Sequence, residues 1–355
     1  MNVTKQLLGA ALCAMAVAGL STGSATAVRS NEASPVTILR EDAIAQAAAA
    51  DCRLPEGQSG LVATYFYYWY DLPGGVHDTY MTQHDVDASA SYRNVAWFEK
   101  QLADQQAAGI DLALAVYWGA AEPSSDIGLA NLGQAASNRS AAGKASPKVG
   151  MFFDTGAIAQ WPVAQRDLTV QANQAKVYEM VHKFYSTLPR QHWGAIDGKP
   201  VVWFWAAEFG IKANASFTSY LRSRFAADFG VTPYLVGDYS WQATAAGATS
   251  FDNYYGWGTA TRGYAESPDT IASVGPGYDE RLMAAAGRSG RMTDREGGRF
   301  YQRNLEYAID SGKPILVLET WNEFHEASGI AETVEEGRTY IDLTRIYTNR
   351  FKCVG

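Results

Sequence analysis

The feature that most constrains the fold is a regular alternation of short apolar segments with amphipathic segments from residue 60 onward. Eight segments are rich in β-branched and aromatic residues, as expected for strands. They are residues 61–70, 111–118, 148–154, 199–205, 232–238, 250–257, 270–279 and 313–319. Segments with helical spacing lie between most of them, at residues 94–110, 170–188, 214–230, 298–312 and 335–351.

This alternation predicts an α/β protein with one (β/α)8 TIM barrel over residues 58–355. Several of the predicted strands are almost continuously apolar, which is typical of strands buried on both faces of a parallel sheet. An open doubly wound sheet is the alternative. The chain has no G-x-G-x-x-G after a strand and no G-x-x-x-x-G-K-[ST], so a nucleotide-binding sheet has no support. The Ala-, Ser- and Gly-rich residues 130–146 are interpreted as a surface excursion from the barrel.

The N-terminus has the pattern of a secretory signal peptide. Lys5 precedes an apolar stretch at residues 7–20, and Ala25-Thr26-Ala27 forms an A-x-A cleavage site. We therefore expect cleavage after Ala27 and a secreted or periplasmic protein, the alternative being an uncleaved membrane anchor. Residues 28–57 are expected to form a loosely ordered or helical leader rather than a domain.

Two cysteines, Cys52 and Cys353, follow the predicted cleavage site and lie near the two ends of the chain. In an oxidising compartment we expect them to form a disulfide, the alternative being two unpaired thiols. A bridge that closes so long a loop contributes on the order of 4 kcal/mol in the chain-entropy view.

The net charge of −8 argues against nucleic acid and anionic membrane surfaces as partners. We expect a monomer that does not associate with membranes.

Carboxylates and aromatic residues gather where the predicted strands end, which is the active-site end of a TIM barrel. Each of them alone could cap a helix or fill the core. Together they suit a sugar, because pyranose rings stack on aromatic faces and their hydroxyls bond to carboxylates. Basic residues are scarce at these positions, which disfavours phosphorylated ligands. The candidate substrate-binding residues of this kind are Tyr68, Trp118, Asp154, Tyr255 and Tyr278.

The densest polar cluster is Glu319-Thr-Trp-Asn-Glu-Phe-His-Glu-Ala-Ser-Gly329, directly after the apolar run of the last strand. Glu323 and Glu326 are three residues apart, so both can reach one ligand. Glycoside hydrolysis needs two carboxyl groups at one bond, one of them able to donate a proton. Trp321 and Phe324 are expected to exclude water from this pair, which would raise a carboxyl pKa.

The same cluster contributes three further candidates. Asn322 and His325, like Trp321, are assigned to the substrate site, with His325 orienting one of the two glutamates. Glu319, still on the strand, is expected to support them.

Metal and cofactor chemistry are not expected. The five histidines show no H-E-x-x-H or similar spacing, and no serine or cysteine lies in a G-x-S-x-G elbow.

The sequence TWNEFHEASGIAE at residues 320–332 resembles the strand-8 motif of glycoside hydrolase family 99, which reads W/F-N-E-W-H-E-G-T followed by I-E. PGYDER at 276–281 and TDREGGRFYQRNLEYAI at 293–309 resemble two further blocks of that family, in the same order. YYWYD and VYWG look like its first two strands. Family 71 and related secreted barrels share much of this pattern. The strong similarity covers residues 270–340.

This resemblance implies a retaining, endo-acting hydrolase of α-linked glycans, with a mannan-like polysaccharide or oligosaccharide as the first expectation. It implies that Glu323 acts as a base on the 2-hydroxyl of the substrate, giving an epoxide-like sugar, and that Glu326 is the acid/base. It also places Tyr278 and Trp118 near bound sugar. Ala327-Ser328, Ala331 and Phe324 depart from the family pattern at positions that border the sugar subsites.

Two other functions compete with a secreted glycoside hydrolase. A catalytically silent carbohydrate-binding barrel would keep the aromatic residues but would not need both Glu323 and Glu326. A metal-dependent hydrolase would need histidine ligands at a spacing that this chain lacks.

Overall fold

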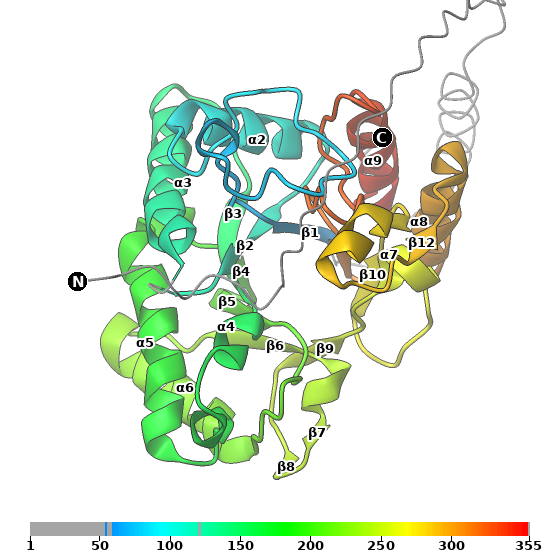
Figure 1. The fold of residues 1–355 in the computed structure, drawn as a ribbon. Coiled ribbons are helices and arrows are strands. Elements are labelled where there is room, and N and C mark those ends of the chain that lie inside the picture. Colours follow the sequence, from blue (N-terminus) through cyan, green and yellow to red (C-terminus); the bar gives the residue numbers. More distant parts are fainter. Residues whose placement is uncertain (1–53, 55–58, 120–121, 354–355) are drawn as a thin grey trace, which may run out of the picture.

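The computed structural model describes residue 54 and residues 59–119 and 122–353, and within them the predicted (β/α)8 barrel is confirmed (Figure 1). Eight parallel strands form the barrel wall in the order β10-β13-β1-β2-β3-β5-β6-β9. They are β1 (Leu61–Phe66), β2 (Leu112–Tyr117), β3 (Lys148–Phe153), β5 (Lys199–Phe204), β6 (Tyr234–Asp238), β9 (Asn253–Tyr255), β10 (Ile271–Val274) and β13 (Ile315–Leu318).

Helices surround this wall. In Figure 1, α3, α5 and α6 lie on one side, while α8 and α9 lie on the other. The α-helices are α2 (Val95–Ala107), α3 (Pro123–Ala141), α4 (Gly156–Ala159), α5 (Gln171–Thr187), α6 (Ala215–Phe229), α7 (Thr259–Arg262), α8 (Arg299–Asp310) and α9 (Thr339–Phe351). Short strands β4 (Ala195–Ile196), β7 (Ala243–Thr244), β8 (Gly247–Ala248), β11 (Tyr278–Asp279) and β12 (Met292–Thr293) lie in the connections. Single 3-10 turns occupy Leu72–Gly74, Val163–Arg166, Arg190–His192, Tyr239–Trp241, Arg281–Ala286 and Glu296–Gly298.

Large aromatic side chains fill the barrel interior. The Tyr65 and Phe152 ring centroids are 4.6 Å apart, and those of Trp203 and Tyr255 are 5.0 Å apart. All four side chains are at most 1 % exposed. Burial of this much apolar area is the main stabilising term of the fold.

The barrel is least regular between β9 and β10. Within the described residues no β ladder joins these two strands, and a side-chain hydrogen bond from Asn253 Nδ2 to Thr270 Oγ1, 2.6 Å long, bridges them instead. The predicted strand at 270–279 is correspondingly shorter than expected. It ends at Val274, because Gly277 turns the chain with a φ of +122° and the next residues pair with β12 in a separate hairpin.

The interpretation of residues 130–146 as a surface excursion was wrong for most of its length, because α3 continues to Ala141. The segment has small residues where larger apolar side chains would reveal helical periodicity, because α3 packs closely against its neighbours. A Cβ on Gly128 would lie 2.5 Å from Cδ2 of Tyr68, and one on Gly133 would lie 3.1 Å from Cδ of Pro189. Glycine and alanine here let α3 approach its neighbours.

Three predictions lie outside the described residues: the signal peptide at 1–27, nearly all of the leader at 28–57, and Cys52 as the disulfide partner of Cys353. In the part of the chain that the structure covers, no helix combines the length and apolarity needed to cross a membrane.

Candidate active site

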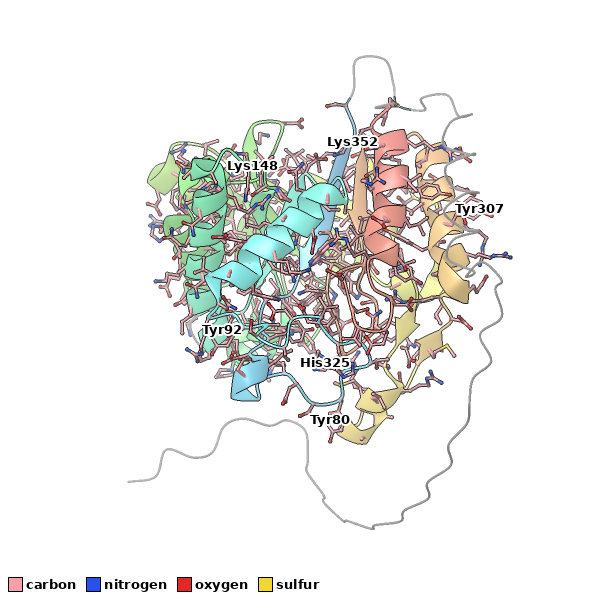
Figure 2. The ribbon with its side chains drawn as sticks, turned by 90° about the horizontal axis from the view of Figure 1, so that it is seen from above. Tyr80, Tyr92, Lys148, Tyr307, His325 and Lys352 are labelled. Atoms are coloured by element: carbon pink, nitrogen blue, oxygen red, sulfur yellow. The ribbon has the colours of Figure 1, made fainter. Side chains whose placement is uncertain are left out.

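One large cavity opens at the C-terminal ends of the barrel strands. In Figure 2, Lys148, the first residue of β3, and Lys352 lie at one end of the molecule, while His325 and Tyr80 lie at the opposite end. The cavity has a volume of about 650 Å³. Its position is that of the active site in TIM-barrel enzymes.

Eight aromatic residues line the cavity. They are Tyr67, Trp69, Trp118, Phe152, Trp205, Phe209, Trp257 and Tyr278. Five carboxyl groups face the same space: Glu122, Asp154, Glu319, Glu323 and Glu326. Flat apolar faces beside acids are the surroundings that a sugar ring needs.

The residues after β13, Glu319–Ala331, form a loop that we call the β13 loop. Asn322 fixes it to β1, since its Oδ1 accepts from the backbone N–H of Tyr67 at 2.9 Å and its Nδ2 donates to the carbonyl of Tyr67 at 2.6 Å. The Tyr70 hydroxyl donates to the Asn322 carbonyl and accepts from the backbone N–H of Phe324, both at 3.1 Å. These bonds hold the backbone on both sides of Glu323.

Arg295 holds the far end of the β13 loop. Its Nη2 donates to the carbonyl of Gly329 at 2.7 Å and to that of Ala327 at 2.5 Å. Its guanidinium also stacks over the Tyr340 ring, 4.3 Å from the centroid. Arg295 therefore fixes the segment that follows Glu326.

Glu323 and Glu326, three residues apart in the sequence, both face the cavity but have different hydrogen-bond partners. His325 Nδ1 lies 3.2 Å from Glu323 Oε1, so the predicted orienting contact is present. Arg288 Nη2 donates to Glu326 Oε1 at 2.6 Å. Burial and the charge of Glu323 raise the pKa of Glu326 to about 7, against the lowering effect of Arg288. A carboxyl group with this pKa can donate a proton at neutral pH.

Glu319 is buried where β13 meets the turn before α7. The backbone N–H of Gly258 donates to both of its oxygens at 3.0 Å, and that of Ala260 donates to Oε2 at 3.2 Å. Burial nevertheless dominates and raises the pKa of Glu319 to about 8. Glu319 is thus mostly protonated at neutral pH, and it links the β13 loop to α7.

Asp154 and Trp118 form a hydrogen-bonded pair in the cavity wall. Trp118 Nε1 donates to Asp154 Oδ2 at 2.9 Å, and the backbone N–H of Gly156 donates to Oδ1 at 2.8 Å. Burial raises the pKa of Asp154 to about 6. This bond sets the orientation of the Trp118 ring in the cavity wall.

Seven of the predicted site residues line the cavity: Trp118, Asp154, Tyr278, Glu319, Glu323, His325 and Glu326. The other four do not. Trp321 donates to Gln101 Oε1 beneath the β13 loop, Tyr68 donates to the carbonyl of Ser125, Tyr255 donates to the carbonyl of Phe204, and Asn322 is the backbone brace described above. All four are fully buried or nearly so.

Two of these four corrections, Tyr68 and Tyr255, follow from the geometry of the strands. Side chains alternate between the two faces of a strand, so Tyr65, Tyr67 and Trp69 point inward from β1 and its extension, while Tyr68 points outward to Phe98. Tyr67, rather than Tyr68, therefore reaches the cavity. Tyr255 points inward but does not reach the cavity, because it packs against Trp203 and Tyr65 in the barrel interior, whereas Trp257, two residues further on, lines the cavity.

Two further expectations from the sequence fail. Trp321 and Phe324 do not shield the glutamates, because both side chains are buried in the core away from the cavity. The aromatic residues that line the cavity surround the two glutamates instead. Basic residues are not scarce at the site, because Arg262, Arg288 and Arg291 line it. No motif marks these arginines: Arg262 is the last residue of α7, and Arg288 and Arg291 lie in the loop between β11 and β12.

Within the described residues, no three or more histidine, cysteine or acidic side chains are grouped as a metal ion would require.

The fold and its cavity define a (β/α)8 barrel with an aromatic, acidic site at the C-terminal ends of its strands. The chain belongs to the family described as a domain of unknown function, DUF5010, which matches residues 64–353. Among curated proteins, none matches this sequence.

Solved structures confirm the fold. A GH99 endo-alpha-mannosidase from Bacteroides thetaiotaomicron superposes with a TM-score of 0.61 at 15% identity, over 82% of this chain and 98% of that chain. The same enzyme in complex with bis-tris-propane gives a TM-score of 0.58 at 16% identity, over 82% and 97%. A glycoside hydrolase-like protein gives 0.60 at 13% identity, over 88% and 99%. The GH99-like fold expected from the motifs is therefore present.

Proposed function

We propose that this protein is a glycoside hydrolase that cleaves α-linked glycans, using Glu323 and Glu326. The observation that carries the proposal is that both carboxyl groups face the large cavity, with the pKa of Glu326 raised to about 7. Two acids at one sugar-sized site are what glycoside hydrolysis requires. The shared fold with a GH99 endo-alpha-mannosidase supports an endo-acting enzyme and makes α-mannans the first substrates to test.

In the proposed reaction Glu326 is the general acid. It gives its proton to the glycosidic oxygen while the bond from that oxygen to C1 breaks. In an α-mannoside the 2-hydroxyl lies on the face of the ring opposite the glycosidic oxygen, so the Glu323 carboxylate can remove its proton while O2 bonds to C1 to give a 1,2-anhydro sugar. Water then opens this ring as Glu326 takes the proton of the water and Glu323 returns its proton to O2. The configuration at C1 is retained.

The contacts around the two glutamates fit these roles. His325 contacts Glu323 Oε1, and the backbone N–H of Glu323 donates to Thr320 Oγ1 at 2.9 Å. Both the side chain and the backbone of Glu323 are therefore held in position. Glu326 is the one partly exposed residue of the β13 loop, as a group that must reach a substrate oxygen should be. Trp118 and Trp257 provide flat faces for sugar rings on either side.

A screen of α-mannans, α-glucans and other glycans tests the proposal. We expect the wild-type protein to release short oligosaccharides, and Glu326→Gln to reduce kcat/KM by roughly 10³-fold, the range of general-acid catalysis. Glu335→Gln is the matched control, because Glu335 is an exposed acid that pairs with His84 outside this cavity.

An unchanged rate for Glu326→Gln would overturn the assignment of the acid. Binding of glycans without any release would instead favour a catalytically silent carbohydrate-binding barrel.

We also propose that the protein is exported. The N-terminal pattern supports cleavage after Ala27, so the mature chain should begin at Val28. Intact-mass measurement of the exported protein tests the cleavage site. The same measurement before and after reduction tests the Cys52–Cys353 disulfide, which adds two hydrogens when reduced.

A further inference from the structure

One wall of the cavity is cationic, although the whole chain carries a net charge of −8. Arg262, Arg288 and Arg291 all line the cavity. We call these three residues the arginine wall. Arg262 ends α7, and the other two belong to the loop between β11 and β12, residues 280–291.

The wall is built as one unit. Thr293 Oγ1 donates to the carbonyl of Thr261 at 2.9 Å, which ties β12 to α7. β11 and β12 pair antiparallel, with Tyr278 opposite Thr293 and Asp279 opposite Met292. The arginines at the end of α7 and in the β11–β12 loop are therefore held on neighbouring segments.

Glu280 shapes the β11–β12 loop from inside. Its carboxylate, with the side chain 3 % exposed, accepts from Arg288 Nε at 2.8 Å, from the Tyr278 hydroxyl at 2.8 Å and from the Ser289 hydroxyl. The backbone N–H of Arg291 donates to it at 3.4 Å. One buried acid thus sets the course of the loop that carries Arg288 and Arg291.

Two of the three arginines lack an acidic partner. Among the residues that the structure describes, the Arg291 guanidinium has no hydrogen-bond or ion-pair partner, and Arg262 bonds only to the carbonyl of Trp257. Gly258 makes room for Arg262, since a Cβ there would lie 2.7 Å from Nη1. Guanidinium groups placed this way are suited to bidentate contact with a carboxylate or phosphate.

Five carboxyl groups face the cavity, but among the described residues none of them pairs with Arg262 or Arg291. Asp154 accepts from Trp118, Glu319 accepts from the backbone N–H groups of Gly258 and Ala260, and Glu323 contacts His325. Arg288 is the only member of the wall paired with carboxylates in the described structure, namely Glu280 and Glu326. The guanidinium groups of Arg262 and Arg291 therefore remain available to an anionic ligand.

Resting on the function proposed above, we propose that the arginine wall binds an anionic group of the glycan, a carboxylate, phosphate or sulfate, on the leaving-group side of the cleaved bond. Arg288 sets the side, because its Nη2 contacts Glu326, the residue that protonates the leaving group. The preferred substrate is then an acidic glycan rather than a neutral one.

Two matched pairs of glycans test this inference. One pair is a phosphorylated α-mannan and the same polymer after phosphatase treatment; the other is an oligosaccharide with an α-mannosyl bond to a glucuronate on its leaving-group side and its carboxyl-reduced form. For the wild-type protein at low ionic strength, we expect kcat/KM to be at least about tenfold higher for the anionic member of one pair or both. The pair that shows the preference identifies the anion.

Arg291→Gln and Arg262→Gln should each move this ratio toward one. Arg281→Gln is the matched control and should keep it, because Arg281 comes from the same loop but pairs with Asp279 at 2.7 Å outside this cavity. Melting temperatures verify that each variant is folded.

A wild-type ratio of one or less in both pairs, with the neutral members cleaved, overturns the inference and leaves the glycoside hydrolase standing. If no glycan is cleaved, the hydrolase proposal fails, and calorimetric titration of the wild-type protein with the same pairs decides the inference. Tighter binding of an anionic member that Arg291→Gln abolishes supports the wall, whereas equal binding of both members overturns it.

Discussion

The β13 loop and the β11–β12 loop both reach the cavity, yet they are held in opposite ways. In the β13 loop, residues 319–331, every residue except Glu326 is buried. In the β11–β12 loop, residues 280–291, Glu280 is the single buried residue. The proposed catalytic carboxylates therefore lie on a segment that is part of the core, whereas Arg288 and Arg291 of the arginine wall lie on a segment that the Glu280 side chain holds. The two loops can therefore be altered separately.

The largest effect that separates the two loops is expected for Arg295→Gln. Arg295 bonds to the carbonyls of Ala327 and Gly329 and stacks on Tyr340, so its loss leaves partly buried carbonyls unpaired. We expect a loss of about 3 kcal/mol in unfolding free energy, measured by urea denaturation. Arg281→Gln, exposed and paired only to Asp279, should leave the unfolding free energy nearly unchanged. Equal effects of the two changes would contradict the comparison.

A local effect is expected for Glu280→Gln. The amide cannot balance Arg288, and it removes charge-assisted bonds to Arg288 and Ser289. We expect the global unfolding free energy to fall by about 1–2 kcal/mol. Limited proteolysis should show faster cleavage between residues 281 and 291 only. Faster cleavage within residues 319–331 as well would show that the two loops are not independent.

Glu319 joins the β13 loop to α7, and its titration should be visible in the stability of the protein. Because burial raises its folded-state pKa to about 8, the folded protein keeps a proton that the unfolded chain loses near the ordinary pKa of 4.5. Stability from this group is therefore greatest below pH 4.5 and declines as the pH rises toward 8. Glu319→Gln should remove this decline, so the melting temperature of the variant relative to wild type should be higher at pH 8 than at pH 5. A constant difference would contradict the assigned protonation state.

The smallest effect is a shift of the pH profile in Arg288→Gln. Arg288 lowers the pKa of Glu326, so its removal should raise that pKa further above its usual range. Because Glu326 must be protonated to act as the acid, the alkaline limb of kcat/KM should move to higher pH. Lys176→Gln, remote from the cavity and bonded to Gln165, serves as the control. A shift to lower pH would show that Arg288 does not act through Glu326.

The sequence predicted the barrel well because its signals are local. Each strand is a short apolar run between turn residues, and the strand positions observed for β2, β3, β5 and β13 differ from the predicted ranges by only a few residues. The motif after β13 likewise placed Glu323, His325 and Glu326 at the cavity, because the C-terminal ends of all eight barrel strands lie at the same end of the barrel.

Other features depended on long-range packing. Tyr67 faces the cavity and Tyr68 does not, because the register of β1 against β2 and β13 decides which face is inside. Trp321 is of a residue type that often stacks on sugar rings, but its indole N–H donates to Gln101 of α2, more than 200 positions away in the sequence. The residues adjacent in the sequence do not determine either outcome.

The sequence alone determined the strand–helix order, the pair of glutamates after the last strand and the pattern of the N-terminal segment, because apolar periodicity and short motifs act over a few residues. Only the tertiary structure decided which aromatic residues face the cavity, that burial raises the pKa of Glu319, and that Arg262, Arg288 and Arg291 line the same cavity as Glu326. The physical reason is that burial, charge pairing and pKa depend on groups that folding brings together from distant parts of the chain.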